Sequence, residues 1–183
     1  MVVFHADFGG SVVRFRSMAA VFMTVCLAAC SPDYNWREVN LADGVVVAIF
    51  PDKPRTQTRV LPFDGHEISF SMTGTVLDDA VFAIGHAALP PEIGQDKASR
   101  ERMYRQVIQS FYGNLGQPLP ETLPASGERF TVEGQGPKGP LRIDGTVWVH
   151  SKSITQGLVT APAHQFPQAQ ADEFLRAIRA PGF

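Results

Sequence analysis

Apolar and polar residues alternate most regularly between Glu67 and Val76. The apolar positions are Ile68, Phe70, Met72 and Val76, and the polar positions are Glu67, Ser69, Ser71, Thr73 and Thr75. A period of two places one face of a strand in a core and the other in water, so we expect a half-buried strand here. Asp78-Asp79 is expected to turn the chain, and Ala80 to Leu89 then returns as the partner strand.

Shorter runs predict the other strands. The β-branched run from Val45 to Phe50 is typical of a buried strand, whereas Arg55 to Leu61 has little apolar content and predicts an edge strand. The remaining predicted strands are Trp36 to Asn40, Glu128 to Glu133, Leu141 to His150 and Ser153 to Ala161. Proline and glycine interrupt the chain at 51–54, 117–127 and 134–140, where we expect turns or loops.

Two segments have the period of a helix. Tyr104, Val107, Ile108, Phe111 and Leu115 recur at i, i+3, i+4, i+7 and i+11. This spacing forms one apolar stripe on a helix of about 16 residues, and Asp96 or Ser99 can cap its start. A shorter helix is predicted from Pro167 to Arg179, burying Ala171, Phe174, Leu175 and Ile178. The order of elements predicts an α+β fold: an antiparallel β-sheet, covered on one face, with one central helix and a C-terminal helix packed on it.

The N-terminal segment has the composition of a bacterial signal peptide. Arg14 and Arg16 precede an apolar run from Met18 to Ala29, which has the length of a signal-peptide core and falls short of the roughly 20 residues of a spanning helix. The run closes on Leu27-Ala28-Ala29-Cys30, which resembles a lipobox, so residues 1–29 are predicted to be a lipoprotein signal peptide and Cys30 the lipidated residue. The alternative is an ordinary secretory leader, with Cys30 incidental.

The lipobox resemblance has consequences for domains and location. Residues 30–35 would form a tether from lipidated Cys30, and 36–183 a single α+β domain. Three acyl chains on Cys30 would anchor the protein to a membrane stably, since one chain binds only marginally. In bacterial lipoproteins an aspartate after the cysteine commonly signals retention in the inner membrane. Ser31 therefore favours the outer membrane, with the domain facing the periplasm.

Charge and cysteine content narrow the function classes. Without Arg14, Arg16 and Asp7, the 16 Lys and Arg of the chain fall to 14 and the 18 Asp and Glu to 17. This slightly acidic balance offers no basic stripe for nucleic acid. Cys26 leaves with the predicted leader and Cys30 would carry lipid. No disulfide is then expected, and the hydrophobic core alone would hold the domain in an oxidising periplasm.

Two likenesses to known families rest on particular residues. The segments that carry the first likeness are, in order, Phe50-Pro-Asp-Lys-Pro54 after a valine run, the alternating hairpin, the central helix, three strands, and a terminal helix with Phe174-Leu175 and Ile178. This order of segments resembles the PsbP-like α/β/α sandwich. That fold is shared by photosystem extrinsic proteins and a Ran-binding import factor. Cys30 to Val39 is also similar to the start of a family of uncharacterised proteobacterial lipoproteins, Cys-Ser-Pro-x-Tyr-x-Trp-Arg-Glu-Val. These likenesses imply an assembly or binding factor without a catalytic metal, and they carry no functional residues.

Motifs for catalysis or cofactor binding are not apparent. There is no Gly-x-Ser-x-Gly, and no pair of carboxylates is forced together for acid–base work. The histidines after the predicted leader are scattered along the chain. His66 and His86 could together form a metal site. The alternative is that His86 is a hydrogen-bonded core residue and His66 is solvated at a loop end. The glycines at 134–140 precede a strand rather than a helix, which favours a hairpin turn over a phosphate loop. We expect no cofactor, no metal and no catalytic residues.

One strand carries candidate binding residues. Between Leu141 and His150, alternation predicts that Arg142, Trp148 and His150 share a face with polar neighbours. Tryptophan beside arginine is a usual composition for a partner-binding hot spot. The alternative is that a helix covers this face and Trp148 belongs to the core.

The sequence therefore supports two functional hypotheses. The first is a non-enzymatic, membrane-anchored envelope lipoprotein that binds another envelope protein or assists its assembly. The second is a module that binds a small ligand or lipid in a cleft between the sheet and the central helix. A hydrolase is the weakest of the three classes considered.

Overall fold

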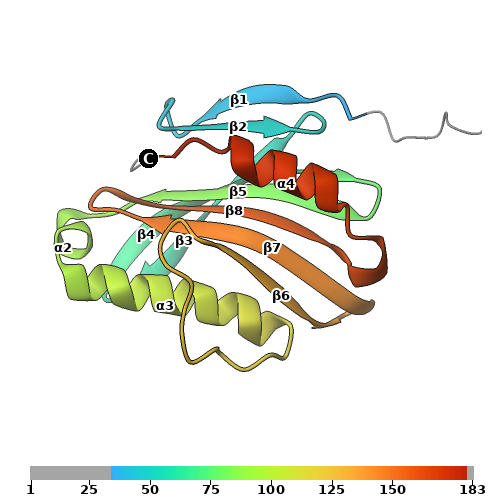
Figure 1. Cartoon of the computed structure of the whole chain (residues 1–183). Helices are drawn as coiled ribbons and strands as arrows, with labels where there is room; N and C mark the ends of the chain where they lie inside the picture. Colours follow the sequence, from blue (N-terminus) through green and yellow to red (C-terminus); the bar gives the residue numbers. More distant parts are fainter. Residues whose placement is uncertain (1–33, 181–183) are drawn as a thin grey trace, which may run out of the picture. The chain divides into compact units, whose positions relative to one another are not determined.

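The computed structural model describes residues 34–180, which form one unit (Figure 1). The predicted leader, the lipobox and Cys30 lie outside these residues. Within them the strands are β1 Arg37–Leu41, β2 Val46–Phe50, β3 Arg55–Phe63, β4 His66–Leu77, β5 Ala80–Ala88, β6 Arg129–Gly136, β7 Gly139–Val149 and β8 Ser153–Pro162. The helices are α2 Pro91–Gly94, α3 Lys97–Asn114 and α4 Gln168–Ala177, with a 3-10 turn at Ala163–Gln165.

Six of these strands form one antiparallel sheet in the order β3-β4-β5-β8-β7-β6. The predicted hairpin closes as expected, since Leu77 pairs with Ala80 across Asp78-Asp79. Between β5 and β6 the chain leaves the sheet to form α2 and α3. Strands β1 and β2 pair separately, and a bridge between Val47 and Arg179 ties β2 to the C-terminal segment. The predicted mixed fold with a large antiparallel sheet is confirmed.

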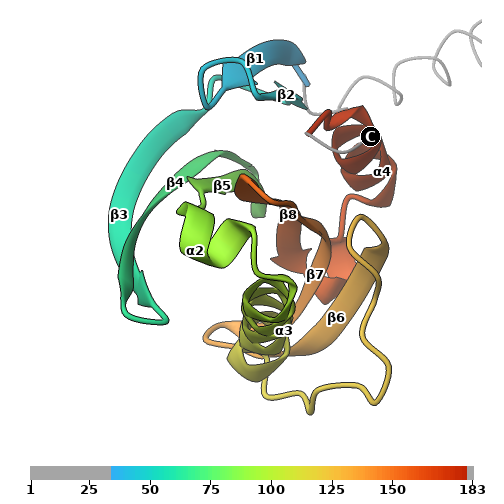
Figure 2. The same cartoon turned by 90° about the vertical axis from the view of Figure 1, so that its left-hand side faces the viewer.

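Helices cover both faces of the sheet, so the expectation of a single covered face is wrong. One core joins Phe82, Ile84 and Val159 of the sheet to α4 and β2. The other joins Ala87, Ile154 and Leu158 to α3. Alternation within β5 and β8 sends these two sets of side chains to opposite faces. Figure 2 shows the sheet curving around α3, with β1, β2 and α4 on its outer side.

Local signals explain where the helices begin and end. The Asp96 carboxylate accepts hydrogen bonds from the backbone N–H of Ser99 at 2.8 Å and its hydroxyl at 2.6 Å, which makes Asp96 the N-cap of α3. After α3, Gly116 adopts a positive φ of 68°, a conformation that glycine tolerates at helix ends. Helix α2 was not predicted because four residues are too few to show a helical period.

The segment at 134–140 is a hairpin, as predicted, but its tip is shorter than expected. Pairing of β6 with β7 continues to Gly136 and Gly139, which leaves Pro137 and Lys138 as the turn. Gly134 and Gly136 lie in paired strand rather than in a flexible loop, and Gly139 adopts a positive φ of 123° after the turn.

Candidate functional site

The structure places the three candidate binding residues on the face of β7 that points toward α4. Arg142 and Trp148 alternate with Ile143 and Val147, which belong to the opposite core. Trp148 is 5% exposed and packs in the core that includes Phe174 and Ile178. This is the packing arrangement that was weighed as the alternative to a hot spot. A partner-binding role for Trp148, Arg142 and His150 stays a prediction.

Arg142 takes part in a buried ion cluster centred on Asp144. Its Nε lies 2.8 Å from Asp144 Oδ1 and its Nη2 3.1 Å from Oδ2. Arg129 of β6 donates to Oδ2 at 2.7 Å, and the hydroxyl of Thr131 donates to Oδ1 at 3.0 Å. From α4, Asp172 lies 2.5 Å from Arg129 and completes the cluster. The cluster therefore joins β6, β7 and α4.

The charges in this cluster are matched. Burial raises the pKa of Asp144, but hydrogen bonds from Arg142, Arg129 and Thr131 outweigh this effect and hold the pKa below its usual range. The pKa of Arg142 is raised, chiefly by its hydrogen bond to Asp144. The guanidinium also lies 4.3 Å from the centroid of the Phe166 ring. Asp144 thus stays ionised at neutral pH and is suited to structural support rather than proton transfer.

His86 and His66 lie on opposite faces of the sheet, so they do not form a joint site. His66 shares the face of Ile68 and Phe70, whereas His86 pairs with Ser71 and faces the other way. The Nδ1 atom of His86 is 3.0 Å from the hydroxyl of Thr155, as expected for a hydrogen-bonded core histidine. Burial lowers its pKa. In residues 34–180 no three His, Cys, Asp or Glu side chains are grouped to hold a metal ion.

His150 lies at the end of β7, beside a pocket of about 440 Å³ that it shares with His86 and Lys152. Its Nε2 atom is buried and has no hydrogen-bond partner among the described residues. The third candidate residue is therefore more accessible than Trp148 but lies at a different end of the strand from Arg142.

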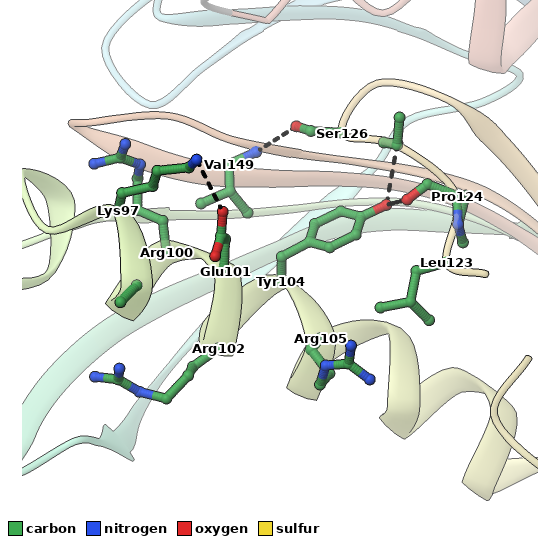
Figure 3. A pocket seen from close by; sticks show the side chains of 12 residues that line it. Lys97, Arg100, Glu101, Arg102, Tyr104, Arg105, Leu123, Pro124, Ser126 and Val149 are labelled. Carbon is green, nitrogen blue, oxygen red and sulfur yellow. Dashed lines mark hydrogen bonds and ion pairs between the residues drawn. The ribbon is translucent and has the colours of Figure 1, made fainter. Parts of the chain in front are cut away.

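A second pocket of about 640 Å³ lies between α3 and residues 123–126 (Figure 3). The hydroxyl of Tyr104 reaches across it and donates to the carbonyl oxygens of Pro124 at 2.6 Å and Ala125 at 3.1 Å. Burial, with smaller contributions from Glu128 and Tyr112, raises the pKa of Tyr104 to about 12. Tyr104 fixes this loop against the helix.

The basic residues of this pocket are largely held by the protein itself. Lys97 lies 3.6 Å from Glu101, and Arg100 donates to the carbonyl of Gly94 at 2.5 Å. Arg102 points away from Tyr104 in Figure 3 and pairs with Asp64 at 2.8 Å. The pocket is therefore a contact between α3 and a loop, in which Lys97 and Arg102 are paired with carboxylates and Arg100 is held by a backbone carbonyl.

The third pocket, of about 270 Å³, lies between α3 and the strands β3, β4, β5 and β8. It is lined by Leu61, Pro62, Phe63, Ile68, Phe70, Ala87, Met103, Gln106, Val107, Ser110, Phe111, Ile154 and Gln156. None of these side chains is charged. A cleft between the sheet and the central helix was the setting of the second functional hypothesis.

One feature of the sequence of β5 bears on the position of this pocket. The α3-facing positions of β5 are Ala83, Gly85 and Ala87, three small residues in alternation. Of the three, Ala87 lines the pocket, whereas the space over Gly85 is occupied by the side chains of Phe70 and Gln156. These small residues predict a pocket only when it is known which face of β5 packs against α3.

Strand β3 forms an edge of the six-stranded sheet next to this pocket. Eight of its nine residues are exposed, including Val60 at 60% and Leu61 at 46%. Its side-chain hydroxyls form hydrogen bonds with β4, between Thr56 and Thr73 and between Thr58 and Ser71. The edge strand predicted at Arg55 to Leu61 is confirmed and runs two residues further.

No protein-family model, curated protein or solved structure matches the chain. Among residues 34–180, no helix is long and apolar enough to cross a membrane.

Proposed function

We propose that the chain is a bacterial envelope lipoprotein, anchored through Cys30, whose domain binds an extended segment of another envelope protein along strand β3. The lipobox at Leu27 to Cys30 supports the anchor, and Ser31 supports the outer membrane. The element order supports a PsbP-like sandwich, and the start Cys30 to Val39 supports membership of the uncharacterised lipoprotein family that it resembles. The proposed role is non-enzymatic.

The exposed edge of β3 is the observation that carries the proposal. Proteins usually protect edge strands by keeping them short, by adding charges or proline, or by covering them. Strand β3 has nine residues, and its protective residues of this kind are Arg55, Arg59 and, near its end, Pro62. Val60 and Leu61 add exposed apolar surface near its middle. Long, uncovered edges of this kind can accept an added strand, which pairs through backbone hydrogen bonds.

Strand β6, at the opposite edge of the sheet, is partly covered by another segment of the chain. On β6 the backbone N–H of Gln135 donates to the carbonyl of Leu115 at 3.2 Å, so the segment after α3 covers part of this edge. In the described residues, β3 has no backbone hydrogen bond to any segment except β4. The contrast between the two edges favours β3 as the binding edge.

Photo-crosslinking in cells tests the binding edge. A photoreactive residue replaces Val60, and in a matched control it replaces Val76, a valine of similar exposure (63%) on β4. We expect a discrete adduct from position 60 alone. The identified partner, once purified, should bind the wild-type domain and the Val76→Asp variant but lose at least tenfold in affinity for Val60→Asp.

Three outcomes would contradict the binding proposal. Equal adducts from positions 60 and 76 would indicate non-specific contact. An adduct of twice the mass of the chain would assign the edge to a second copy instead. A turnover activity abolished by a point change in the folded domain would make the protein an enzyme.

The anchor is tested separately by metabolic labelling with an alkyne fatty acid. Cys30→Ala should lose the label and leave the membrane fraction, because the acylated thiol is gone. Cys26→Ala is the matched control, since this cysteine precedes the predicted cleavage site, and it should keep both. Labelling that survives in Cys30→Ala would refute the lipobox assignment.

A further inference from the structure

The pocket between α3 and the sheet contains a polar group that its own fold does not satisfy. Gln156 lines this pocket, and its side chain is 7% exposed. Among the described residues its amide has no hydrogen-bond partner. The amide atoms are not among the fully buried unpaired atoms of the described residues, so they keep contact with water, whose place a ligand group in the pocket can take. The carboxamide offers two N–H donors and an acceptor oxygen to whatever enters the pocket.

The surroundings hold Gln156 in place at the floor of the pocket. Its side chain runs over Gly85, where a Cβ would lie 2.6 Å from its Nε2 and 2.7 Å from its Cγ. The Phe70 ring covers the same glycine from the other side. The missing side chain at Gly85 therefore makes room for Gln156 to lie flat against the sheet.

The size and lining of the pocket limit what can bind. Apolar cavities of ~150 Å³ hold benzene, so by scaling this one holds roughly ten non-hydrogen atoms. The lining side chains are apolar except Gln106, Ser110 and Gln156. Because no charged side chain lines the pocket, a carboxylate or ammonium group beside Gln156 would be buried without a counter-charge. The group that meets Gln156 must be neutral.

The mouth of the pocket is apolar on the β3 side and polar on the α3 side. Leu61 and Phe63 of β3 line it, and Leu61 is 46% exposed. On the α3 side, Gln106 and Ser110 are both exposed. The apolar part of a bound ligand would thus contact apolar side chains from the floor of the pocket to its β3 rim.

We propose that this pocket binds a free neutral amphiphile of roughly ten non-hydrogen atoms, with an apolar body and one hydroxyl, carbonyl or amide group that hydrogen-bonds to Gln156. The proposal does not rest on strand addition at β3. It gives the second functional hypothesis a defined site and a defined ligand class.

The test uses p-cresol and p-xylene, which differ by a hydroxyl in place of a methyl group. Binding is followed by NMR on the domain, reading the backbone amide signals of Ala87 and Ile154, which line the pocket and are present in every variant. We expect saturable shifts of these signals, and p-cresol binding about fivefold tighter than p-xylene because of the added hydrogen bond. Gln156→Leu should abolish this preference while retaining p-xylene binding.

Gln106→Leu is the matched control, because it makes the same change at the rim and should keep the preference. Should Gln156→Leu fail to fold, Ser110→Trp is the second variant. It places a large ring at the exposed mouth and should weaken both ligands at least tenfold.

Three results would overturn the proposal. Absence of saturable shifts up to the solubility of both probes would show that the pocket does not take such ligands. An unchanged preference in Gln156→Leu would remove Gln156 from the site. Displacement of bound p-cresol by the partner captured at position 60 would assign the pocket to a side chain of that partner.

Discussion

Arg142 and Asp144 lie two residues apart on β7 and form a two-point ion pair on one face of the strand. The Nε–Oδ1 and Nη2–Oδ2 distances are 2.8 and 3.1 Å. Residues at i and i+2 of a strand share a face, so the two side chains can pair while the backbone of β7 stays extended. Since the Asp144 side chain is 1% exposed, this bond and the ones from Arg129 and Thr131 replace its hydration.

Asp144→Asn should strongly destabilise the domain. Removing one partner of a buried ion pair leaves the other charge uncompensated and typically costs about 3–5 kcal/mol. Urea unfolding followed by circular dichroism measures the loss. Asp172→Asn is the control, because that carboxylate is 43% exposed and its exposed pairing is worth less than about 1 kcal/mol. Equal losses in both variants would show that burial of Asp144 is not decisive.

The same carboxylate should make stability depend on acid pH. Its pKa is lower folded than unfolded, where Asp titrates near ~3.9. The stabilisation is therefore complete above the unfolded pKa and is lost as pH falls through the folded value. Unfolding free energy measured from pH 6 down to pH 2 should fall less steeply in Asp144→Asn than in the wild type. Parallel curves would contradict this assignment.

Tyr104→Phe should cost about 1 kcal/mol, the usual net value of a hydrogen bond, because the hydroxyl donates to Pro124 and Ala125. Tyr112→Phe is the control, since the hydroxyl of Tyr112 makes no hydrogen bond to another described residue. Thermal unfolding at neutral pH compares the two variants. A loss from Tyr112→Phe as large as that from Tyr104→Phe would refute the role of the 123–126 contact.

Tyr104 also predicts alkaline sensitivity. Its pKa is raised to about 12, so unfolding favours its deprotonation. The resulting stabilisation is fully present below the unfolded pKa of ~10 and is lost as pH rises toward the folded value. Wild-type stability should fall more between pH 10 and 12 than that of Tyr104→Phe, with ultraviolet titration of the phenolate as the direct readout.

Gly94→Ala and Gly113→Ala should change stability in opposite directions. A Cβ at Gly94 would collide with the carbonyl oxygen of Ser151, and overpacking of this kind costs about 1–3 kcal/mol. A Cβ at Gly113 meets no heavy atom within 4 Å, and alanine in a helix is favoured over glycine by about 0.5–1 kcal/mol. Melting temperatures of the two variants should therefore lie on either side of the wild-type value.

The strands and long helices were predictable because their periods are local. The alternation from Glu67 to Val76 places β4, and the stripe from Tyr104 to Leu115 places α3. Which helix covers which face is a non-local property, because it depends on how β5 pairs with β8. At the closest pairing, Ala88 with Ser153, 64 residues of the chain lie between the partners. For that reason the sequence predicted one covered face and the molecule has two.

The candidate site shows the same division. Alternation correctly placed Arg142, Trp148 and His150 on one face, but it could not show that α4 buries Trp148. Gln156 was not predictable as a site residue because a single glutamine in a strand forms no sequence motif. Its position is informative only beside Gly85, which pairs with it from the neighbouring strand.

Strand β5 sends Phe82 and Ile84 to one core and Ala83, Gly85 and Ala87 to the other. The large residues fix how α4 and β2 are held, and the small ones set how much space remains beneath α3. Substitutions on the two sides touch different neighbours. An evolving lineage can therefore reshape the space beside Ala87 while the packing that holds the C-terminal helix stays unchanged, whereas a methyl group at Gly85 would displace Phe70 and Gln156.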